Sequence, residues 1–321
     1  MAKSKTLFPD LVPYEYCPLS PEAHTRALKL EPPIDPSAPM SEYDALSYTW
    51  GSPEFTEEII LDHYYSKRVT ENLYHALIRF RLPAGTRLLW VDALCSNHDD
   101  NDENALSVIA WLGADKEAED CLRRLHLLAK QPKSSEVTAE IVKELGYITQ
   151  LPWFHRRWVI QEVVLSPHVV ITCGRVSVPW TRFFQHLLQE SREGVIDSIV
   201  LLLDMWRSSI LKDDTGTGFR MFELLTEIHE AGCADDRDRV YALGALASDM
   251  EVQDGSGRTT ISPDKAIIPA DYTVSAESLY HKVTIELITR KAALKPVDLF
   301  VQCAIRHIEN ELDGMPSWVP D

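Results

Sequence analysis

Trp158 and Glu162 are the residues whose types and spacing point most directly to chemistry. They lie four positions apart in a segment with helical periodicity, so both fall on one face of a helix. The aromatic residues at 153–154 precede them and supply apolar walls. A carboxylate that is partly desolvated by aromatic rings suits acid–base catalysis or the stabilisation of a cationic transition state. The alternative is a structural glutamate that pairs with Arg157 or Arg175.

Two apolar segments are expected to be strands that bring further polar groups to one edge of a sheet. Residues 45–50 form the first, which ends at Gly51, and the almost continuously apolar run 87–94 forms a central strand covered on both faces. Ligands bind at the carboxyl ends of strands in open α/β sheets, so Asp92 is a candidate for orienting a ligand. An aspartate that accepts hydrogen bonds from the backbone of the next loop would give the same pattern.

The loop 95–103 is dense in oxygen, nitrogen and sulfur donors, but its spacing does not fit a known metal site. A calcium loop needs a glycine near the position of Ala105 and a distal glutamate, and both are missing. We therefore expect a solvated acidic turn and no metal. Cys95 as a nucleophile, with His98 or His155 as its base, lacks a recognisable orienting carboxylate, so a buried inert thiol is favoured.

Composition and missing motifs exclude several function classes. The net charge of −17 argues against binding to nucleic acid or to anionic membranes, which require basic patches. No glycine-rich phosphate loop and no G-x-S-x-G elbow is present, which sets aside classical dinucleotide folds, P-loop enzymes, kinases and α/β-hydrolases.

Cellular location is also suggested by composition. The six scattered cysteines show no zinc spacing and predict reduced thiols in the cytoplasm. The first ten residues lack the apolar core of a signal peptide, and the apolar stretch 195–206 is too short and too often interrupted to span a bilayer. We expect no membrane anchor.

The order of patterns predicts an α/β domain followed by helices. An extended proline-rich arm is expected over 1–42, an α/β core over 43–180 and a mostly helical extension over 181–321. Short strands are expected at 28–30, 58–61, 67–70, 108–112 and 168–173. Helices are expected at 71–82 (with Thr70 as N-cap), 116–130, 136–149, 153–165, 180–190, 195–211, 219–231, 238–247 and 275–291, and a surface loop at 250–265.

Three motifs in order resemble those of the fungal heterokaryon incompatibility (HET) domain family. Residues 46–51 match L-S-Y-x-W-G, residues 90–98 follow W-I-D-A-x-C-I-N-Q, and residues 156–162 match R-x-W-x-x-Q-E. Further similar stretches are 72–73, 108–113, 173–174, 238–243 and 316–321. The resemblance covers most of the chain. It implies a mostly parallel sheet of TIR-like or flavodoxin-like type, flanked by helices.

The resemblance also implies a function. HET domains act in non-self recognition and programmed cell death, a form of innate immunity, and look like distant relatives of TIR domains, many of which cleave NAD with a glutamate four residues after a helical tryptophan. Glu162 would then be the catalytic residue, stabilising the oxocarbenium-like charge as nicotinamide leaves. The substrate-binding residues would be Tyr48, Trp50, Asp92, Asn97 and Trp158. No cofactor is expected, and NAD would be the substrate.

The chain departs from the family pattern between the second motif and the strand at 108–112. A parallel crossover needs about 10–12 residues including its helix, and residues 95–107 show no apolar helical stripe. We infer that a helix-sized block is missing near 103–108. The motif's Gln has also become His98, and its second Ile has become Ser96.

Other functions fit the same residues. The chain could be a non-catalytic module that signals by self-association, a degenerate HET copy, or a protein recruited to small-molecule metabolism. Its expected partners are a second copy of itself or other cell-death signalling proteins. Enzymatic NAD cleavage is distinguished from these by nicotinamide release that depends on Glu162.

Overall fold

The computed structural model describes a defined part of the 321-residue chain: residues 12–13, 28–30, 43–61, 65–82, 84, 87–95, 107–128, 135–183, 202, 205–206, 219–228, 231–253 and 266–289. The chain divides into two compact units. The first consists of Met1–Phe154 and Ser166–Ile196, and the second of His155–Leu165 and Asp197–Asp321. Most of the expected arm over 1–42 lies outside the described residues.

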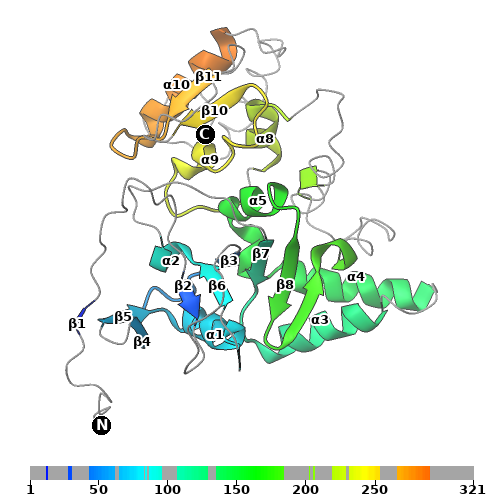
Figure 1. The fold of residues 1–321 in the computed structure, drawn as a ribbon. Coiled ribbons are helices and arrows are strands. Elements are labelled where there is room, and N and C mark those ends of the chain that lie inside the picture. The colour runs from blue at the N-terminus through cyan, green and yellow to red at the C-terminus, as the bar shows by residue number, and fades with distance from the viewer. Residues whose placement is uncertain are drawn as a thin grey trace. The chain divides into compact units, whose positions relative to one another are not determined.

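The first unit is built on a six-stranded sheet (Figure 1). Its strands, from one edge to the other, are β2 (Leu28–Leu30), β6 (Arg87–Trp90), β3 (Asp44–Tyr48), β7 (Ser107–Trp111), β8 (Val169–Cys173) and β9 (Val176–Pro179). The four inner strands are parallel, and the two edge strands run antiparallel to their neighbours. The expected mostly parallel α/β sheet is confirmed.

The order of the parallel strands identifies the type of sheet. Taken in chain order, β3 is the first, β6 the second, β7 the third and β8 the fourth, so their spatial order is 2-1-3-4. This is the flavodoxin-like doubly wound order, in which the direction of winding reverses between the first and the third strand. The reversal therefore lies between β3 and β7.

Helix α1 (Glu71–Phe80) covers one face of this sheet. Thr70 is its N-cap, as expected, because its hydroxyl accepts a hydrogen bond from the Leu73 N–H. The apolar residues of α1 pack against alternate residues of the strands, including Leu46, Tyr48 and Trp111. Phe80 meets the Trp111 ring edge-on, with 5.7 Å between the ring centroids. The amphipathic pattern predicted from the sequence thus forms a core.

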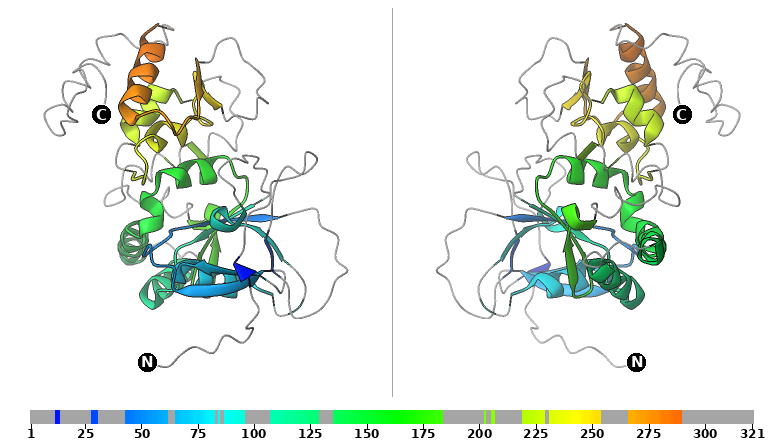
Figure 2. Two further views of the ribbon diagram at one scale, coloured as in Figure 1. Left: turned by 90° about the vertical axis from the view of Figure 1, so that its left-hand side faces the viewer. Right: turned by 90° about the vertical axis from the view of Figure 1, so that its right-hand side faces the viewer.

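Helices α3 (Lys116–Leu128) and α4 (Ser135–Thr149) lie side by side along the sheet, with α3 against β8 and β9 (Figure 2). A short 3₁₀ helix η1 (Pro152–His155) follows α4 and places Trp153 in the interior, where its indole N–H donates to the Ser47 hydroxyl at 2.7 Å. Ser47 is the middle residue of the L-S-Y motif. This residue of the first motif is therefore part of the core.

A second, smaller sheet precedes α1. Strands β4 (Glu57–Leu61) and β5 (Tyr65–Val69) form the expected antiparallel hairpin, and β1 (Val12–Pro13) pairs in parallel with β5. Lys67 on β5 donates from its ammonium to the Ala93 carbonyl at 2.8 Å. Burial lowers the pKa of Lys67. The hairpin is thereby tied to the turn that follows β6.

The expectation of one strand over 87–94 was wrong. Strand β6 ends at Trp90, and residues Asp92–Cys95 form a helical turn, α2, whose Leu94 and Cys95 N–H groups donate to the Val91 carbonyl at 2.9 and 2.7 Å. A short apolar run has no periodicity that separates a buried strand from a buried helix. Asp92 therefore begins a helix and does not end a strand.

The predicted helix over 153–165 is also interrupted. Arg156 has an extended backbone, with φ −85° and ψ 131°, and separates η1 from α5 (Arg157–Val164). Two backbone hydrogen bonds to Gly232 explain the break: Arg157 N–H donates to the Gly232 carbonyl at 2.9 Å, and Gly232 N–H donates to the His155 carbonyl at 2.7 Å. Hydrogen bonds to a segment distant in the chain thus replace the backbone hydrogen bonds that a continuous helix would form here.

The second unit is largely helical, as expected. Besides α5 it contains α8 (Met221–Glu227), α9 (Asp238–Tyr241) and α10 (Ala276–Thr289). Of the helix expected over 195–211, only residues 202 and 205–206 are described, and they are helical. Of the helix expected over 180–190, which belongs to the first unit, residues 180–183 are described and are helical.

The second unit also contains two strands that were not predicted from the sequence. Strands β10 (Met250–Gln253) and β11 (Ala266–Pro269) pair in parallel, and β10 lies in the segment expected to be a surface loop. Met250 and Ile268 are fully buried, which explains why these few residues form strands. Residues 254–265 of that expected loop lie outside the described part of the chain.

Candidate functional site

Helix α5 presents Trp158 and Glu162 one turn apart, as the spacing predicted. Both side chains are half-buried, whereas Val159, Ile160 and Val163 on the same helix are buried. The aromatic pair expected to flank them, Trp153 and Phe154, belongs to the other compact unit.

Those two aromatic residues pack with Trp180 and Phe183. Trp153 meets Phe154 and Trp180 edge-on at 4.9 and 6.2 Å between ring centroids, and Phe183 stacks on Phe154 and Trp180 at 6.1 and 6.0 Å. All four rings are buried. The aromatic walls expected around Glu162 are therefore core residues of the α/β unit.

Arg157 anchors the start of α5. Its side chain is 1% exposed, and its guanidinium donates to three backbone carbonyls: Arg239 at 3.0 Å, Ile228 at 2.9 Å and Ala231 at 3.3 Å. A planar guanidinium with five donors is suited to joining several carbonyls at once. Arg157 therefore fixes α5 to the segment 228–239 of the same unit.

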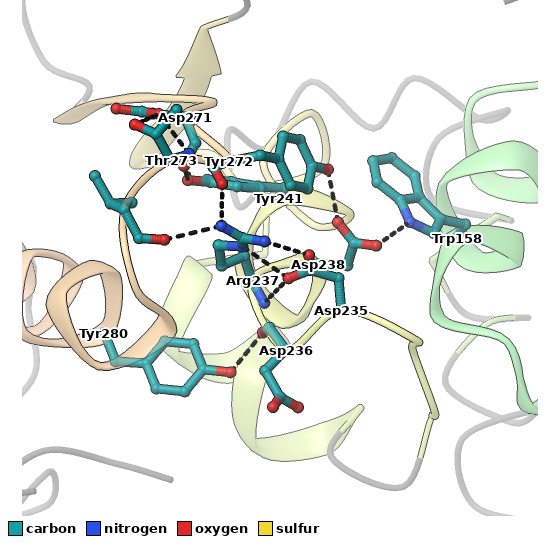
Figure 3. A network of polar contacts seen from close by, with 11 residues as sticks. Trp158, Asp235, Asp236, Arg237, Asp238, Tyr241, Asp271, Tyr272, Thr273 and Tyr280 are labelled. Carbon is teal, nitrogen blue, oxygen red and sulfur yellow. Dashed lines mark hydrogen bonds and ion pairs between the residues drawn. The ribbon is translucent and has the colours of Figure 1, made fainter. Parts of the chain in front are cut away.

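Asp238 holds the indole of Trp158. One carboxylate oxygen accepts a hydrogen bond from Trp158 Nε1 at 3.0 Å, and the other accepts one from the Tyr272 hydroxyl at 2.7 Å (Figure 3). Burial, together with this bond to Asp238, raises the pKa of Tyr272, so the phenol remains a donor. With both oxygens engaged, the carboxylate fixes the indole to one orientation beside Glu162.

Arg237 in turn holds the segment that carries Asp238. Its guanidinium forms a bidentate pair with Asp235, at 2.8 and 2.6 Å, and hydrogen-bonds the Tyr272 and Val274 carbonyls (Figure 3). It also lies 5.1 Å from the centroid of the Tyr272 ring. The hydrogen bond from Arg237 lowers the pKa of Asp235. Residues 235–241 are therefore braced against 271–274, and Asp238 is rigidly placed.

Sequence reasoning did not identify Asp238, Arg237 or Tyr272 as partners of Trp158. In the sequence, the stretch 238–243 stands out only by its similarity to the family. The charged run 235–239 could have indicated a polar network, because charges of opposite sign this close together form ion pairs or hydrogen bonds. The partner residue lies 80 positions away, and no local pattern identifies it.

Three of the remaining predicted site residues lie at the carboxyl edge of the parallel strands in the first unit. Tyr48 ends β3 and is 3% exposed, packed in the core under α1. Trp50 follows it and is 44% exposed. Asp92 is exposed at the first position of α2, which follows the neighbouring strand β6. Asn97 lies outside the described residues.

The structure therefore brings the predicted residues together in two groups. Trp158 and Glu162 share one helix of the second unit, and Tyr48, Trp50 and Asp92 share one sheet edge of the first unit. Their assigned roles in binding and catalysis stay predictions.

The described cysteines are free thiols. Burial raises the pKa of Cys173 to about 12 and also raises the pKa of Cys121 and Cys233. Cys95 is buried, and its sulfur contacts the Val91 N–H and the Leu89 carbonyl. Within the part of the chain that the structure describes, no group of three or more metal-ligating residues occurs. No described helix is long and apolar enough to cross a bilayer.

Comparison with known proteins agrees with the three sequence motifs. Residues 43–162 match the family described as Heterokaryon incompatibility protein (HET). Heterokaryon incompatibility protein 6, OR allele, of Neurospora crassa is 25% identical over 424 aligned positions, which cover 97% of this chain. This chain spans about 60% of the length of that relative.

The aligned length exceeds the 321 residues of this chain, so the relative carries insertions that this chain lacks. No solved structure matches the chain. The three motifs and the matched segment agree, and residues 43–162 of this chain are similar to the heterokaryon incompatibility (HET) family.

Proposed function

We propose that this chain acts in fungal non-self recognition, and that it promotes programmed cell death by cleaving NAD. Its similarity to a heterokaryon incompatibility protein supports the cellular role. The pairing of Trp158 and Glu162 on α5 carries the chemical part of the proposal. The likeness to NAD-cleaving TIR domains rests on this spacing and on the sheet order.

The reaction requires a carboxylate next to the ribose that carries nicotinamide. The bond between the ribose anomeric carbon and the nicotinamide nitrogen breaks, and its electron pair leaves with neutral nicotinamide. The ribose gains oxocarbenium character, which the Glu162 carboxylate stabilises. Water then attacks the anomeric carbon and releases a proton, giving ADP-ribose.

The anchoring of α5 supports this assignment of roles. Electrostatic stabilisation is most effective when the charged group is held in place before the reaction. Arg157 fixes the first residue of the helix to three carbonyls, and Asp238 fixes the indole one turn before Glu162. The polar network in Figure 3 thus serves as a rigid support for the catalytic carboxylate.

Nicotinamide release from NAD by the purified chain tests the proposal. Glu162→Gln keeps the size of the side chain and removes its charge, so it should abolish release while the thermal unfolding temperature stays near that of the wild type. Glu227→Gln is the matched control, because Glu227 is an exposed glutamate on α8 in the same unit. If the folded wild type releases no nicotinamide, the chain is a non-catalytic module.

A further inference from the structure

Tyr272 is the half-exposed member of the network that orients Trp158. The residue is 49% exposed, yet its hydroxyl turns inward and donates to one oxygen of Asp238 at 2.7 Å (Figure 3). The other oxygen of Asp238 accepts the Trp158 indole N–H at 3.0 Å. All three residues belong to the second unit. Two hydrogen bonds therefore connect a side chain at the surface of this unit to the indole one turn before Glu162.

The phenol hydrogen is the atom that Asp238 requires from Tyr272. An ionised carboxylate only accepts hydrogen bonds, and a hydroxyl that donates to a carboxylate forms one of the stronger hydrogen bonds in proteins. Among the described residues, the Tyr272 hydroxyl and the Trp158 N–H are the donors to the two carboxylate oxygens. A substituent on the phenol oxygen removes this hydrogen, so one oxygen of Asp238 loses its donor.

The surroundings of the phenol oxygen reject negative charge. Burial raises the pKa of Tyr272, and the hydrogen bond to Asp238 and the charge of Asp235 raise it further. A phosphate group on this oxygen would add about 1.5–2 negative charges at pH 7. The Arg237 guanidinium lies 5.1 Å from the centroid of the Tyr272 ring and already pairs with Asp235. A phosphate would therefore repel Asp238 and compete with Asp235 for Arg237.

The loop that carries Tyr272 is suited to local opening. It joins β11 to α10 over residues 270–275. Side chains from α9 and the residue before it hold its backbone: Arg237 donates to two of its carbonyls, and the Tyr241 hydroxyl exchanges hydrogen bonds with the backbone of Asp271. Segments held by a few partly exposed hydrogen bonds open at a small fraction of the cost of global unfolding. The phenol oxygen therefore becomes accessible to an enzyme without unfolding of the unit.

We infer that Tyr272 is a regulatory modification site, and that transfer of a phosphoryl group from ATP to its phenol oxygen by a protein-tyrosine kinase switches off the site on α5. The phenol oxygen attacks the γ-phosphorus, the bond to the leaving ADP breaks, and the phenol proton passes to the general base of the kinase. The inference rests on the proposed function for the activity that is lost. Tyr272 is a positioning residue that acts through Asp238 and Trp158 and does not touch the substrate.

Phosphotyrosine in place of Tyr272, introduced into the full chain by suppression of an amber codon, tests the inference. The kcat for nicotinamide release should fall by at least about tenfold, the scale expected for the loss of a hydrogen bond to a charged group. KM should stay within about threefold of the wild type, because no contact with the substrate is removed. Phosphotyrosine in place of Tyr147, an exposed tyrosine on α4 of the first unit, is the matched control and should change neither constant.

Tyr272→Phe separates the loss of the donor from the added charge. The ring and its contacts with Tyr241 and Arg237 are kept, and only the hydroxyl is removed. We expect kcat to fall by about threefold to tenfold, with an unfolding temperature within a few degrees of the wild type. Accessibility is tested by incubating the folded wild type with a protein-tyrosine kinase and ATP, followed by mass spectrometry. Modification of Tyr147 without modification of Tyr272 would overturn the inference.

The indole N–H resonance of Trp158 reports the coupling without any turnover. It is assigned in the nitrogen–proton spectrum of the chain labelled with ¹⁵N-tryptophan, as the signal that Trp158→Phe removes. A hydrogen bond to a carboxylate moves an indole proton downfield, so the phosphorylated chain should show this resonance shifted upfield. The indole resonances of the other tryptophans should stay in place.

The outcomes distinguish the inference from the proposed function. A shifted Trp158 resonance together with a lower kcat supports both. A shifted resonance in a chain whose unmodified form releases no nicotinamide would overturn the cleavage reaction and leave the coupling of Tyr272 to Trp158 standing. Turnover with an unchanged kcat and an unchanged resonance in the phosphorylated chain would overturn the inference and leave the reaction standing. A large fall in unfolding temperature for both Tyr272→Phe and the phosphorylated chain would show a structural role alone and overturn the switch.

Discussion

Replacement of Arg157 by methionine should destabilise the second unit strongly. The guanidinium is 1% exposed and serves the carbonyls of Ile228, Ala231 and Arg239. Methionine fills most of the volume but donates no hydrogen bond, so three carbonyls lose a partner. The Ile228 carbonyl still accepts the Ala231 N–H at 3.2 Å, so the other two carbonyls carry the cost. At about 1–3 kcal/mol for each buried group left unsatisfied, the gross cost is about 2–6 kcal/mol.

Two effects reduce that cost. The variant no longer buries a charge, and the carbonyls regain part of their hydrogen bonding from water or from small movements. We therefore expect a loss of about 2–4 kcal/mol in the free energy of unfolding.

Urea denaturation followed by the far-ultraviolet circular dichroism signal measures this loss. Arg182→Met is the control, because Arg182 is exposed, and its replacement should change the unfolding free energy by less than about 0.5 kcal/mol. A loss below about 1 kcal/mol for Arg157→Met would refute the reasoning that Arg157 anchors α5.

Three further predictions concern other contacts. Gly244→Ala should lower the free energy of unfolding by about 1–3 kcal/mol, because the new Cβ would lie 2.6 Å from Val252 Cβ and 3.1 Å from the Val252 backbone nitrogen. An unchanged temperature of thermal unfolding would contradict this packing. Hydrogen bonds from Arg124 lower the pKa of Glu144 in the folded state below its unfolded value of about 4.5. The ion pair therefore contributes its full stability above about pH 4.5 and loses it as the pH falls through the folded pKa. Melts from pH 7 to pH 3 should show the advantage of wild type over Glu144→Gln shrinking below about pH 4.5, and an advantage independent of pH would be inconsistent with the pair. Asp238→Asn should lower kcat for nicotinamide release more than it raises KM, since it weakens the hold on the indole beside the catalytic carboxylate; an unchanged kcat would argue against its supporting role.

The sequence predicted the helices and strands whose ends and buried faces depend on neighbouring residues, such as a capping residue or an apolar stripe. Helix α1 has an N-cap threonine and an apolar stripe at helical spacing, and it formed where expected. Inner strands such as β7 and β8 were recognisable as short apolar runs bounded by turns. The pairing of Trp158 and Glu162 followed from helical periodicity alone.

The features that the sequence did not predict depend on contacts between segments that are distant in the chain. The end of β6 at Trp90 and the break at Arg156 depend on backbone hydrogen bonds that no periodicity encodes. Strands β10 and β11 are four residues each and, among the described residues, pair only with each other, so burial supplied by the rest of the second unit determined them. The partner of Trp158 lies 80 positions away, which is why the sequence did not identify this network.

The helix-sized block inferred to be missing near 103–108 stays a prediction, because residues 96–106 lie outside the described part of the chain. The described residues place only the short α2 between β6 and β7.

Nicotinamide release from NAD, measured by chromatography for the wild type and for Glu162→Gln side by side, tests the central claim most directly. The account predicts steady release by the wild type and a reduction of at least about a thousandfold in the variant, the scale expected when a preorganised stabilising group is removed. Equal release by the two proteins, or none by a wild type whose cooperative melting shows it to be folded, would contradict it.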